Sequence, residues 1–257
     1  MRFSANLGFL WTELSLPDAI RAAKAAGFEA VECHWPYETP ARDVHAALVE
    51  TGLPMLGLNT RRGDVSIGEN GLSALPGRES EARAAIDEAL DYGKAVGAGA
   101  VHVMTGFAEG DAAHQCFIEN LSYASEPATA RGMTILIEPL NRHDAPGYFL
   151  QTTDQARAII EAVGAQNLKL MFDCYHVGRT EGDVTTRLTD LLDIVGHIQF
   201  AAVPSRGQPA DSELDYRFVF REISKLGWDQ PLGAEYKPGG PTDPTLGWMQ
   251  ALAPEKQ

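Results

Sequence analysis

Cysteine, basic residues and long apolar runs are all scarce in this sequence of 257 residues. The three cysteines, Cys33, Cys116 and Cys174, lie far apart and form no CxxC pair. Neither a disulfide framework nor a thiolate zinc site is therefore predicted, and a cytoplasmic location is expected. Lys and Arg number 21 against 35 Asp and Glu, and the resulting net charge of −14 would repel a phosphate backbone. No apolar run approaches the roughly 18 residues of a membrane span, and the N-terminal segment lacks the pattern of a signal peptide. We therefore expect no nucleic-acid partner and no membrane partner.

Short apolar, β-branched segments alternate with longer amphipathic segments along the whole chain. Strands are predicted at eight places: Phe3–Leu7, Ala30–His34, Met55–Asn59, Val101–Met104, Thr134–Ile137, Leu168–Phe172, His197–Phe200 and Leu232–Ala234. Helices are predicted at eight places between and after them: Pro17–Ala26, Ala41–Thr51, Glu79–Val96, Ala112–Arg131, Thr153–Val163, Val184–Ile194, Tyr216–Leu226 and Pro244–Leu252.

Eight strand–helix units of about 32 residues each predict a single (β/α)8 TIM barrel of the α/β class, one domain spanning residues 1–257. The rival architecture is a doubly wound open sheet, which usually carries a GxGxxG turn after its first strand. The sequence from Asn6 to Trp11 offers no such turn, so the barrel is favoured.

Four oxygen-bearing side chains end consecutive predicted strands: Glu138, Asp173, Gln199 and Glu235. They are spaced 35, 26 and 36 residues apart, each about one strand–helix unit. Active sites of these barrels lie at the carboxyl ends of the strands, so the four side chains are expected to converge there.

Three carboxylates held close together raise one another's pKa unless a positive charge compensates them. A ligand set of oxygens alone suits one divalent cation, Mg²⁺ or Mn²⁺, better than zinc or copper. The alternative is that each acidic residue merely caps the helix that follows it. Four such residues in register on successive strands favour the metal.

Three further residues are predicted to face the same rim as candidates for binding substrate. His176 and Arg206 follow the sixth and seventh strands within a few residues. Lys237 lies two residues beyond Glu235 and faces as Glu235 does if strand geometry continues there. Arg206 can offer a carboxylate a bidentate fork and Lys237 a point charge.

At these residues the sequence resembles the hydroxypyruvate isomerase family. This family is a branch of the xylose isomerase-like barrels that also contains 2-oxo-tetronate isomerases and is related to ketose 3-epimerases. The resemblance covers nearly the whole chain, and its motifs are short individually but specific in this order and spacing: Phe3–Leu7, Gly63–Glu69, Leu75–Glu79, Ile137–Pro139, Asp173–His176, Gly196–Gln199 and Glu235–Pro238. Asp64 and Glu69 belong to one of these motifs, but no chemical role follows from it.

The resemblance implies an intramolecular oxidoreductase that converts hydroxypyruvate to tartronate semialdehyde (2-hydroxy-3-oxopropanoate) through an enediolate. It also implies that Glu138 and Glu235 both ligate the metal and transfer protons as acid and base. His176 and Arg206 fall where the related epimerases hold substrate oxygens. The resemblance also implies that Gln199 replaces a histidine metal ligand of the wider superfamily. The hydroxypyruvate isomerase branch shares this glutamine.

Several alternatives remain open on the sequence. A 2-oxo-tetronate isomerase would use the same metal and glutamates with a roomier pocket. A ketose 3-epimerase is disfavoured by Gln199, a metal-dependent endonuclease by the charge of −14, and a non-catalytic sugar-acid binder by the presence of both glutamates. A homo-oligomer is compatible with the sequence, since Trp11, Trp35 and Phe107 either line the pocket or pack against a partner subunit.

Overall fold

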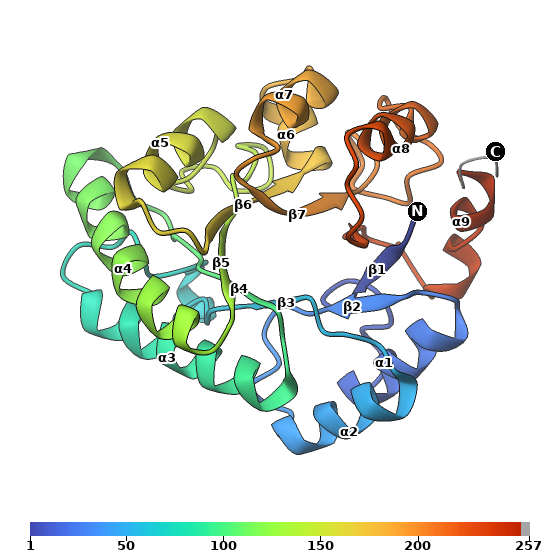
Figure 1. The fold of residues 1–257 in the computed structure, drawn as a ribbon, viewed down its shortest axis with the longest axis horizontal. Coiled ribbons are helices and arrows are strands. Elements are labelled where there is room, and N and C mark those ends of the chain that lie inside the picture. The colour runs from blue at the N-terminus through green and yellow to red at the C-terminus, as the bar shows by residue number, and fades with distance from the viewer. Residues whose placement is uncertain (253–257) are drawn as a thin grey trace.

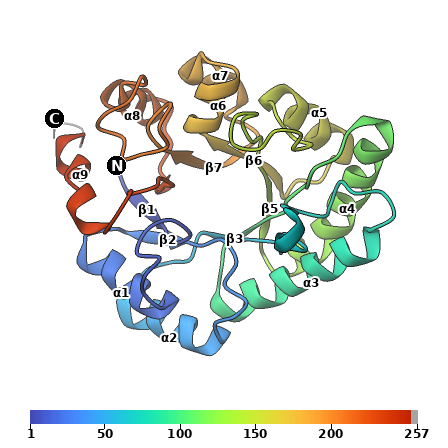
Figure 2. The same ribbon diagram turned by 180° about the vertical axis from the view of Figure 1, so that it is seen from behind.

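Eight parallel strands form a barrel with the helices arranged around the outside, as Figures 1 and 2 show from opposite sides. The computed structural model describes residues 1–252; the last five residues of the predicted domain span lie outside the described residues. Along the sheet the strands follow the order β2-β1-β8-β7-β6-β5-β4-β3. The predicted (β/α)8 barrel is confirmed.

The strands are β1 Phe3–Asn6, β2 Ala30–Glu32, β3 Gly57–Asn59, β4 Ala100–His102, β5 Thr134–Ile137, β6 Leu168–Asp173, β7 Val195–Phe200 and β8 Leu232–Ala234. The α-helices are α1 Leu16–Ala25, α2 Ala41–Thr51, α3 Glu79–Val96, α4 Gly110–Ala130, α5 Thr153–Val163, α6 Cys174–Thr180, α7 Val184–Leu191, α8 Tyr216–Lys225 and α9 Trp248–Ala251. Two 3₁₀ turns are η1 Val65–Ile67 and η2 Asp243–Thr245.

The predicted helix over Pro244–Leu252 is wrong in one respect, because the segment forms two short elements, η2 and α9, rather than one helix. The backbone N–H of Leu246 bonds to Asp243 three residues back, which closes a 3₁₀ turn, and Gly247 separates this turn from α9. Glycine is a poor helix former, so the break falls there. Helix α6, which follows β6 without a loop, was not predicted.

The first and last strands of the sheet order, β2 and β3, close the barrel through a less regular ladder. A single isolated bridge joins Val31 to Met55. Backbone hydrogen bonds run from Val31 N–H to Pro54, from Cys33 N–H to Gly57 and from Asn59 N–H to His34. Met55 was predicted to begin the third strand, but it forms only this isolated bridge, and β3 begins at Gly57.

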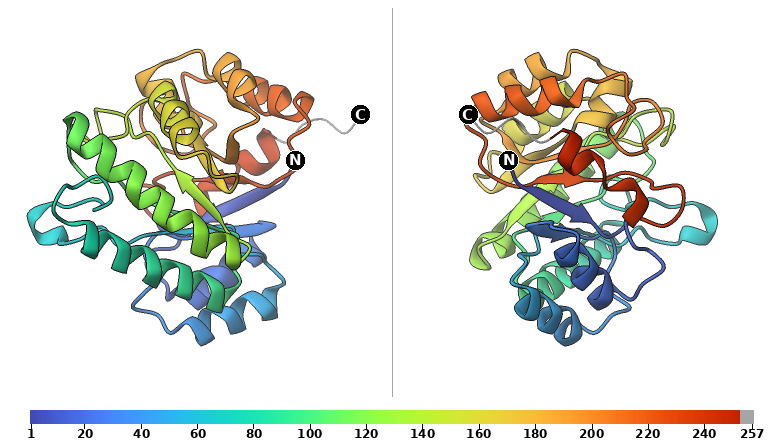
Figure 3. Two further views of the ribbon diagram at one scale, coloured as in Figure 1. Left: turned by 60° about the vertical axis from the view of Figure 1, so that its left-hand side comes forward. Right: turned by 90° about the vertical axis from the view of Figure 1, so that its right-hand side faces the viewer.

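An aromatic cluster packs helix α9 against the barrel. The Trp248 ring of α9 lies 4.9 Å from the Phe3 ring of β1 and 5.3 Å from the Phe200 ring of β7, and the Phe220 ring of α8 lies 5.0 Å from Phe200. Accordingly α9 runs beside the N-terminal strand in the right-hand view of Figure 3. Among residues 1–252, no helix has the length and apolar character needed to cross a membrane.

Candidate active site

Four buried side chains converge at the carboxyl ends of strands β5, β6 and β8: Glu138, Asp173, His176 and Glu235. Each offers one nitrogen or oxygen atom of a kind that can ligate a metal, and these atoms all lie within 4.8 Å of one another. Glu138 and Glu235 directly follow β5 and β8, Asp173 ends β6, and His176 lies in the first turn of α6. Parallel strands bring these residues together because their carboxyl ends share one face of the barrel.

Gln199, on β7, adds a neutral oxygen to this end of the barrel. Its side-chain N–H donates to Glu32 at 2.8 Å, while its Oε1 is buried and has no hydrogen-bond partner among the described residues. Glu138 Oε1 and Asp173 Oδ2 are likewise buried without partners. Buried polar atoms are nearly always satisfied, so three orphaned oxygens at the ends of adjacent strands form a group that could hold a cation.

The pKa shifts of the acidic residues are also those of a site that could hold a cation. Burial, followed by the charges of Glu235 and Asp173, raises the pKa of Glu138 well above its usual value. Burial and then Glu235 raise the pKa of Asp173 to about 8. Burial alone would also raise the pKa of Glu235, but Arg206 and His34 outweigh it, and the pKa of that carboxyl is strongly lowered. If all three carboxyl groups were ionised, their negative charges would exceed the single positive charge of the neighbouring Arg206 guanidinium.

Glu235 is held at both of its oxygens. Its Oε1 accepts from Asn6 Nδ2 at 3.0 Å and lies 2.9 Å from His34 Nε2. Its Oε2 accepts from Arg206 Nη2 at 2.8 Å. Because each bond fixes the carboxylate from a different strand or loop, Glu235 has a defined orientation in the site.

Arg206 reaches the site from the loop after β7 in a left-handed backbone conformation, with φ of 54°. Its backbone N–H donates to Ala202 and its carbonyl accepts from Lys237. The guanidinium lies 4.8 Å from the ring centre of Phe9 and 5.2 Å from that of Tyr175. These contacts keep the guanidinium beside Glu235, while its buried Nε has no partner among the described residues.

The hydrogen bonds of His176 decide which of its nitrogens carries the proton. Its Nδ1 accepts from the backbone N–H of Asn141 at 3.0 Å and lies 2.8 Å from Asn141 Nδ2. The side-chain oxygen of Asn141 is already engaged by the N–H groups of His143 and Asp144, so its amide nitrogen faces the imidazole. Burial lowers the pKa of His176 to about 3, so the ring is neutral and its proton lies on Nε2.

A neutral imidazole with its proton on Nε2 offers no lone pair there to a metal. The Nε2–H of His176 lies 3.7 Å from Asp173 Oδ2 and 3.9 Å from Glu138 Oε1, and it has no partner among residues 1–252. It is therefore an unused donor aimed at the acidic cluster. The chemistry of the donor set leaves Glu138, Asp173, Gln199 and Glu235 as the residues that fit a hard divalent cation.

Lys237 lies apart from this arrangement. Its side chain is exposed and makes no hydrogen bond or ion pair within the described part of the chain, although its backbone N–H bonds to Arg206. Strand β8 ends at Ala234, so the alternation that would have aligned Lys237 with Glu235 does not continue. Its contact with substrate stays a prediction.

The Gly63–Glu79 segment forms a loop that projects beyond the ring of helices in both views of Figure 3. Glu69 accepts the backbone N–H of Asp64 at 2.6 Å and pairs with Arg78, while Asp64 caps η1 through Ser66. Both acidic residues of this motif thus have partners within the loop.

The three aromatic residues noted in the sequence have different surroundings. Trp11 is buried and its indole N–H donates to Asp243, Trp35 stacks on Arg62 at 3.9 Å, and Phe107 is exposed.

Sequence reasoning missed several residues that support the site. Asn6 and His34 hold Glu235, and Asn141 sets the tautomer of His176. Asn6 ends the first strand, and that position was a signal available in the sequence. Asn141 is in contact with a residue 35 positions away, which no local pattern reveals.

The chain matches the family described as "Xylose isomerase-like TIM barrel" over residues 20–253. It is 44% identical to a protein of Cupriavidus necator named 2-oxo-tetronate isomerase, over 97% of each chain. It is 35% identical to a protein of Escherichia coli named hydroxypyruvate isomerase, over 97% of this chain and 98% of the relative. A crystal structure described as AP endonuclease, family 2, from Brucella melitensis superposes with a TM-score of 0.93 at 35% identity, over 97% of this chain and 98% of the other.

Proposed function

The chain belongs to the xylose isomerase-like TIM barrel family, and from this premise we propose that it is a metal-assisted isomerase of a small 2-oxo/hydroxy acid. Its curated relatives from two bacteria are named as isomerases of such acids. The observation that carries the proposal is the convergence of three buried carboxylates, Glu138, Asp173 and Glu235, at the ends of β5, β6 and β8. Glu138 and Asp173 each keep one buried oxygen without a partner among the described residues, as does Gln199 on β7.

The proposed reaction moves a carbonyl group by one carbon. In hydroxypyruvate a proton leaves C3, the electrons of the C–H bond form the C2–C3 double bond of an enediolate, and a proton then arrives at C2. The proton of the C3 hydroxyl is lost and the C2 oxygen gains one, which yields tartronate semialdehyde with no net change in atoms or electrons. The chain must therefore hold one group that accepts a proton and one that supplies it.

Glu138 and Glu235 are proposed for these two tasks. Their ligating atoms belong to one group no more than 4.8 Å across, and they come from strands β5 and β8, on different sides of the β6 and β7 residues. Mg²⁺ or Mn²⁺, held by Glu138, Asp173, Gln199 and Glu235, would supply Lewis-acid stabilisation of the developing oxygen charge. The direction of reaction decides which glutamate accepts the proton first.

His176 and Arg206 are proposed to bind substrate oxygens. The unpartnered Nε2–H of His176 is a neutral donor, and the buried, unpartnered Nε–H of Arg206 is a charged one. Either Arg206 or Lys237 is proposed to bind the substrate carboxylate. Arg206→Ala and Lys237→Ala test this assignment, because at least one of them must raise KM for a 2-oxo acid.

A four-carbon 2-oxo-tetronate is the second candidate substrate. The 44% identity to the relative from Cupriavidus necator supports this acid as a candidate beside hydroxypyruvate. Cleavage of DNA, suggested by the description of the Brucella melitensis structure, is disfavoured by the net charge of −14. The buried, unpaired thiols of the three cysteines agree with the proposed cytoplasmic location.

Proton NMR in D₂O tests the proposal. The protein, loaded with Mn²⁺ or Mg²⁺, is mixed with hydroxypyruvate or with 2-oxo-tetronate, and isomerisation and solvent deuterium incorporation are followed together. We expect turnover of at least one acid, and the faster one gives the chain length. Turnover of neither, in protein that demonstrably holds its metal, would overturn the assignment.

Glu235→Gln and Glu181→Gln form a matched pair for this assay, since each native glutamate side chain is 6% exposed and is paired with an arginine at 2.8 or 2.9 Å. Glu181 pairs with Arg187 outside the acidic cluster. Glu235→Gln is expected to abolish deuterium incorporation in folded protein, whereas Glu181→Gln keeps it. Undiminished exchange in Glu235→Gln would remove that residue from the chemistry.

A further inference from the structure

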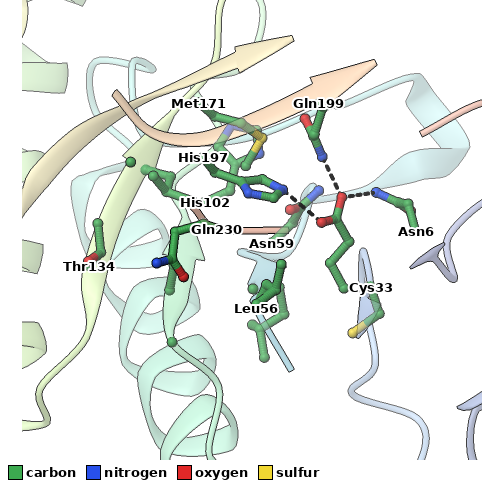
Figure 4. Close-up of a pocket in the computed structure, with 17 residues that line it drawn as sticks. Asn6, Cys33, Leu56, Asn59, His102, Thr134, Met171, His197, Gln199 and Gln230 are labelled. Atoms are coloured by element: carbon green, nitrogen blue, oxygen red, sulfur yellow. Dashed lines mark hydrogen bonds and ion pairs between the residues drawn. The ribbon is translucent and has the colours of Figure 1, made fainter. Parts of the chain in front are cut away.

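A fourth buried carboxylate, that of Glu32 at the end of β2, lies outside the acidic cluster and has no part in the proposed reaction. It borders a cavity of about 170 Å³ inside the barrel, lined also by His102, His197 and Gln199. Figure 4 shows dashed lines from Asn6, His197 and Gln199 converging on one carboxylate, which belongs to Glu32.

The hydrogen bonds of Glu32 divide between its two oxygens. Oε2 lies 2.7 Å from His197 Nε2. Oε1 accepts from Gln199 Nε2 at 2.8 Å and from Asn6 Nδ2 at 3.1 Å. A buried carboxylate is expensive to maintain unless it is paired and hydrogen-bonded, and the hydrogen bonds of Glu32 among the described residues join it to three nitrogen-bearing side chains.

These bonds have a consequence for Gln199. An amide side chain presents a donor on one side and an acceptor on the other. Because the Glu32 carboxylate only accepts, it draws the Nε2 of Gln199 to itself, and Oε1 must point away. That oxygen is the one left buried and without a partner.

The lack of a side chain at Gly233 on β8 leaves room for the Glu32 carboxylate. A Cβ atom at Gly233 would lie 2.6 Å from Glu32 Oε1 and 2.8 Å from Gln199 Cγ. Real Cβ contacts are essentially never closer than 3.0 Å, so any side chain at position 233 would displace Glu32 or Gln199.

We propose that Glu32 is a positioning residue that fixes the Gln199 amide so that its oxygen is presented as a metal ligand. The proposal rests on the proposed metal-assisted function. Residues one layer removed from a metal typically change its affinity 10- to 100-fold by orienting the ligands, and Glu32 has the contacts for that task.

The test measures Mn²⁺ affinity of the purified protein by isothermal titration calorimetry, with electron paramagnetic resonance of free Mn²⁺ as an independent readout. Glu32→Met removes every acceptor at similar volume and is expected to weaken Mn²⁺ binding about 10- to 100-fold. Glu32→Gln keeps one acceptor oxygen for Gln199 and Asn6 at nearly the same side-chain volume. It is expected to stay within about threefold of wild type.

A double-variant cycle separates positioning from general damage. If Glu32 acts through Gln199, the variant with both Glu32→Met and Gln199→Ala binds Mn²⁺ no more than about threefold more weakly than Gln199→Ala alone. Losses that multiply would overturn the proposal, as would wild-type affinity in Glu32→Met. If Glu32→Met does not fold, Glu32→Leu, which also lacks an acceptor, replaces it, and Gly233→Ala serves as a second variant that displaces both Glu32 and Gln199.

The titration of the wild-type protein distinguishes failure of the proposed metal-assisted function from failure of the proposed role of Glu32. Absence of Mn²⁺ binding by the wild-type protein would overturn the metal-assisted function and this proposal together. Mn²⁺ binding by the wild type with equal affinity in Glu32→Met would overturn only the role of Glu32.

Discussion

Gly233→Ala adds a single methyl group at the point where strand β8 passes Glu32. The new Cβ would lie 2.6 Å from Glu32 Oε1, and ordinary contacts begin at about 3.4 Å, so the oxygen must move by about 0.8 Å. Strand β8 cannot easily yield instead, because Gly233 is paired with Ser4 on one side and with Gln199 on the other. If the oxygen moves directly away from Gln199, a shift of that size lengthens the 2.8 Å bond to about 3.6 Å, beyond hydrogen-bonding reach.

Two measurable effects follow from this displacement. Overpacking of a filled interior lowers the free energy of unfolding by about 1–3 kcal/mol, which urea denaturation would measure. In addition, the Gln199 amide loses the acceptor that orients it, so Mn²⁺ affinity measured by calorimetry is expected to fall at least fivefold.

Gly196→Ala is the matched control, since its Cβ would lie 2.6 Å from Lys169 Cβ and 2.9 Å from Leu136 Cδ2. Steric conflict is thus comparable, but no atom of Glu32 is among these contacts. We expect a similar loss of stability with unchanged Mn²⁺ affinity. The reasoning is refuted if Gly233→Ala binds Mn²⁺ as tightly as wild type, or if Gly196→Ala weakens binding equally.

Three further predictions concern stability and protonation. Trp248→Ala opens the aromatic cluster and is expected to lower the free energy of unfolding by about 3–5 kcal/mol in urea. Phe218→Ala, an exposed aromatic residue, should cost no more than about 0.5 kcal/mol, and equal losses would contradict the packing argument. Arg206→Ala leaves buried Glu235 uncompensated and is expected to lower the stability of metal-free protein by about 3–5 kcal/mol, a loss that Mn²⁺ should reduce; a loss that Mn²⁺ leaves unchanged would contradict this account. Because burial and Glu235 raise the pKa of Asp173 to about 8, this carboxyl is protonated at pH 7 without metal, and Mn²⁺ must displace the proton. Calorimetry in two buffers of different ionisation enthalpy should detect proton release at pH 7 and tighter binding at pH 8 than at pH 6, and no release would show that the carboxyl is already ionised.

The sequence was sufficient to predict the barrel and the carboxylates that end its strands, because both follow from local patterns. A buried strand followed by an acidic residue is visible at Glu138, Asp173 and Glu235, and parallel topology then brings their ends together. No additional long-range information was needed for that convergence.

The supporting contacts could not be predicted in the same way. Glu32 meets His197 across 165 residues, and Asn6 meets Glu235 across 229. Each pairing depends on which side of a strand faces the interior and on the register between strands. The prediction for Lys237 assumed that strand geometry continued past Glu235, and only the structure shows that β8 ends at Ala234.

The position of Arg206 between Phe9 and Tyr175 has a consequence for the entropy of ligand binding. The side-chain conformational entropy of an arginine on an open loop is worth about 2 kcal/mol, and much of it is lost when the arginine binds an anion. Here the ring contacts and the left-handed backbone restrict that freedom when the chain folds, before any ligand arrives. A small acid with few atoms of its own would thus meet a cation that is already immobilised, and lysine, which lacks a planar head to stack, would not replace it.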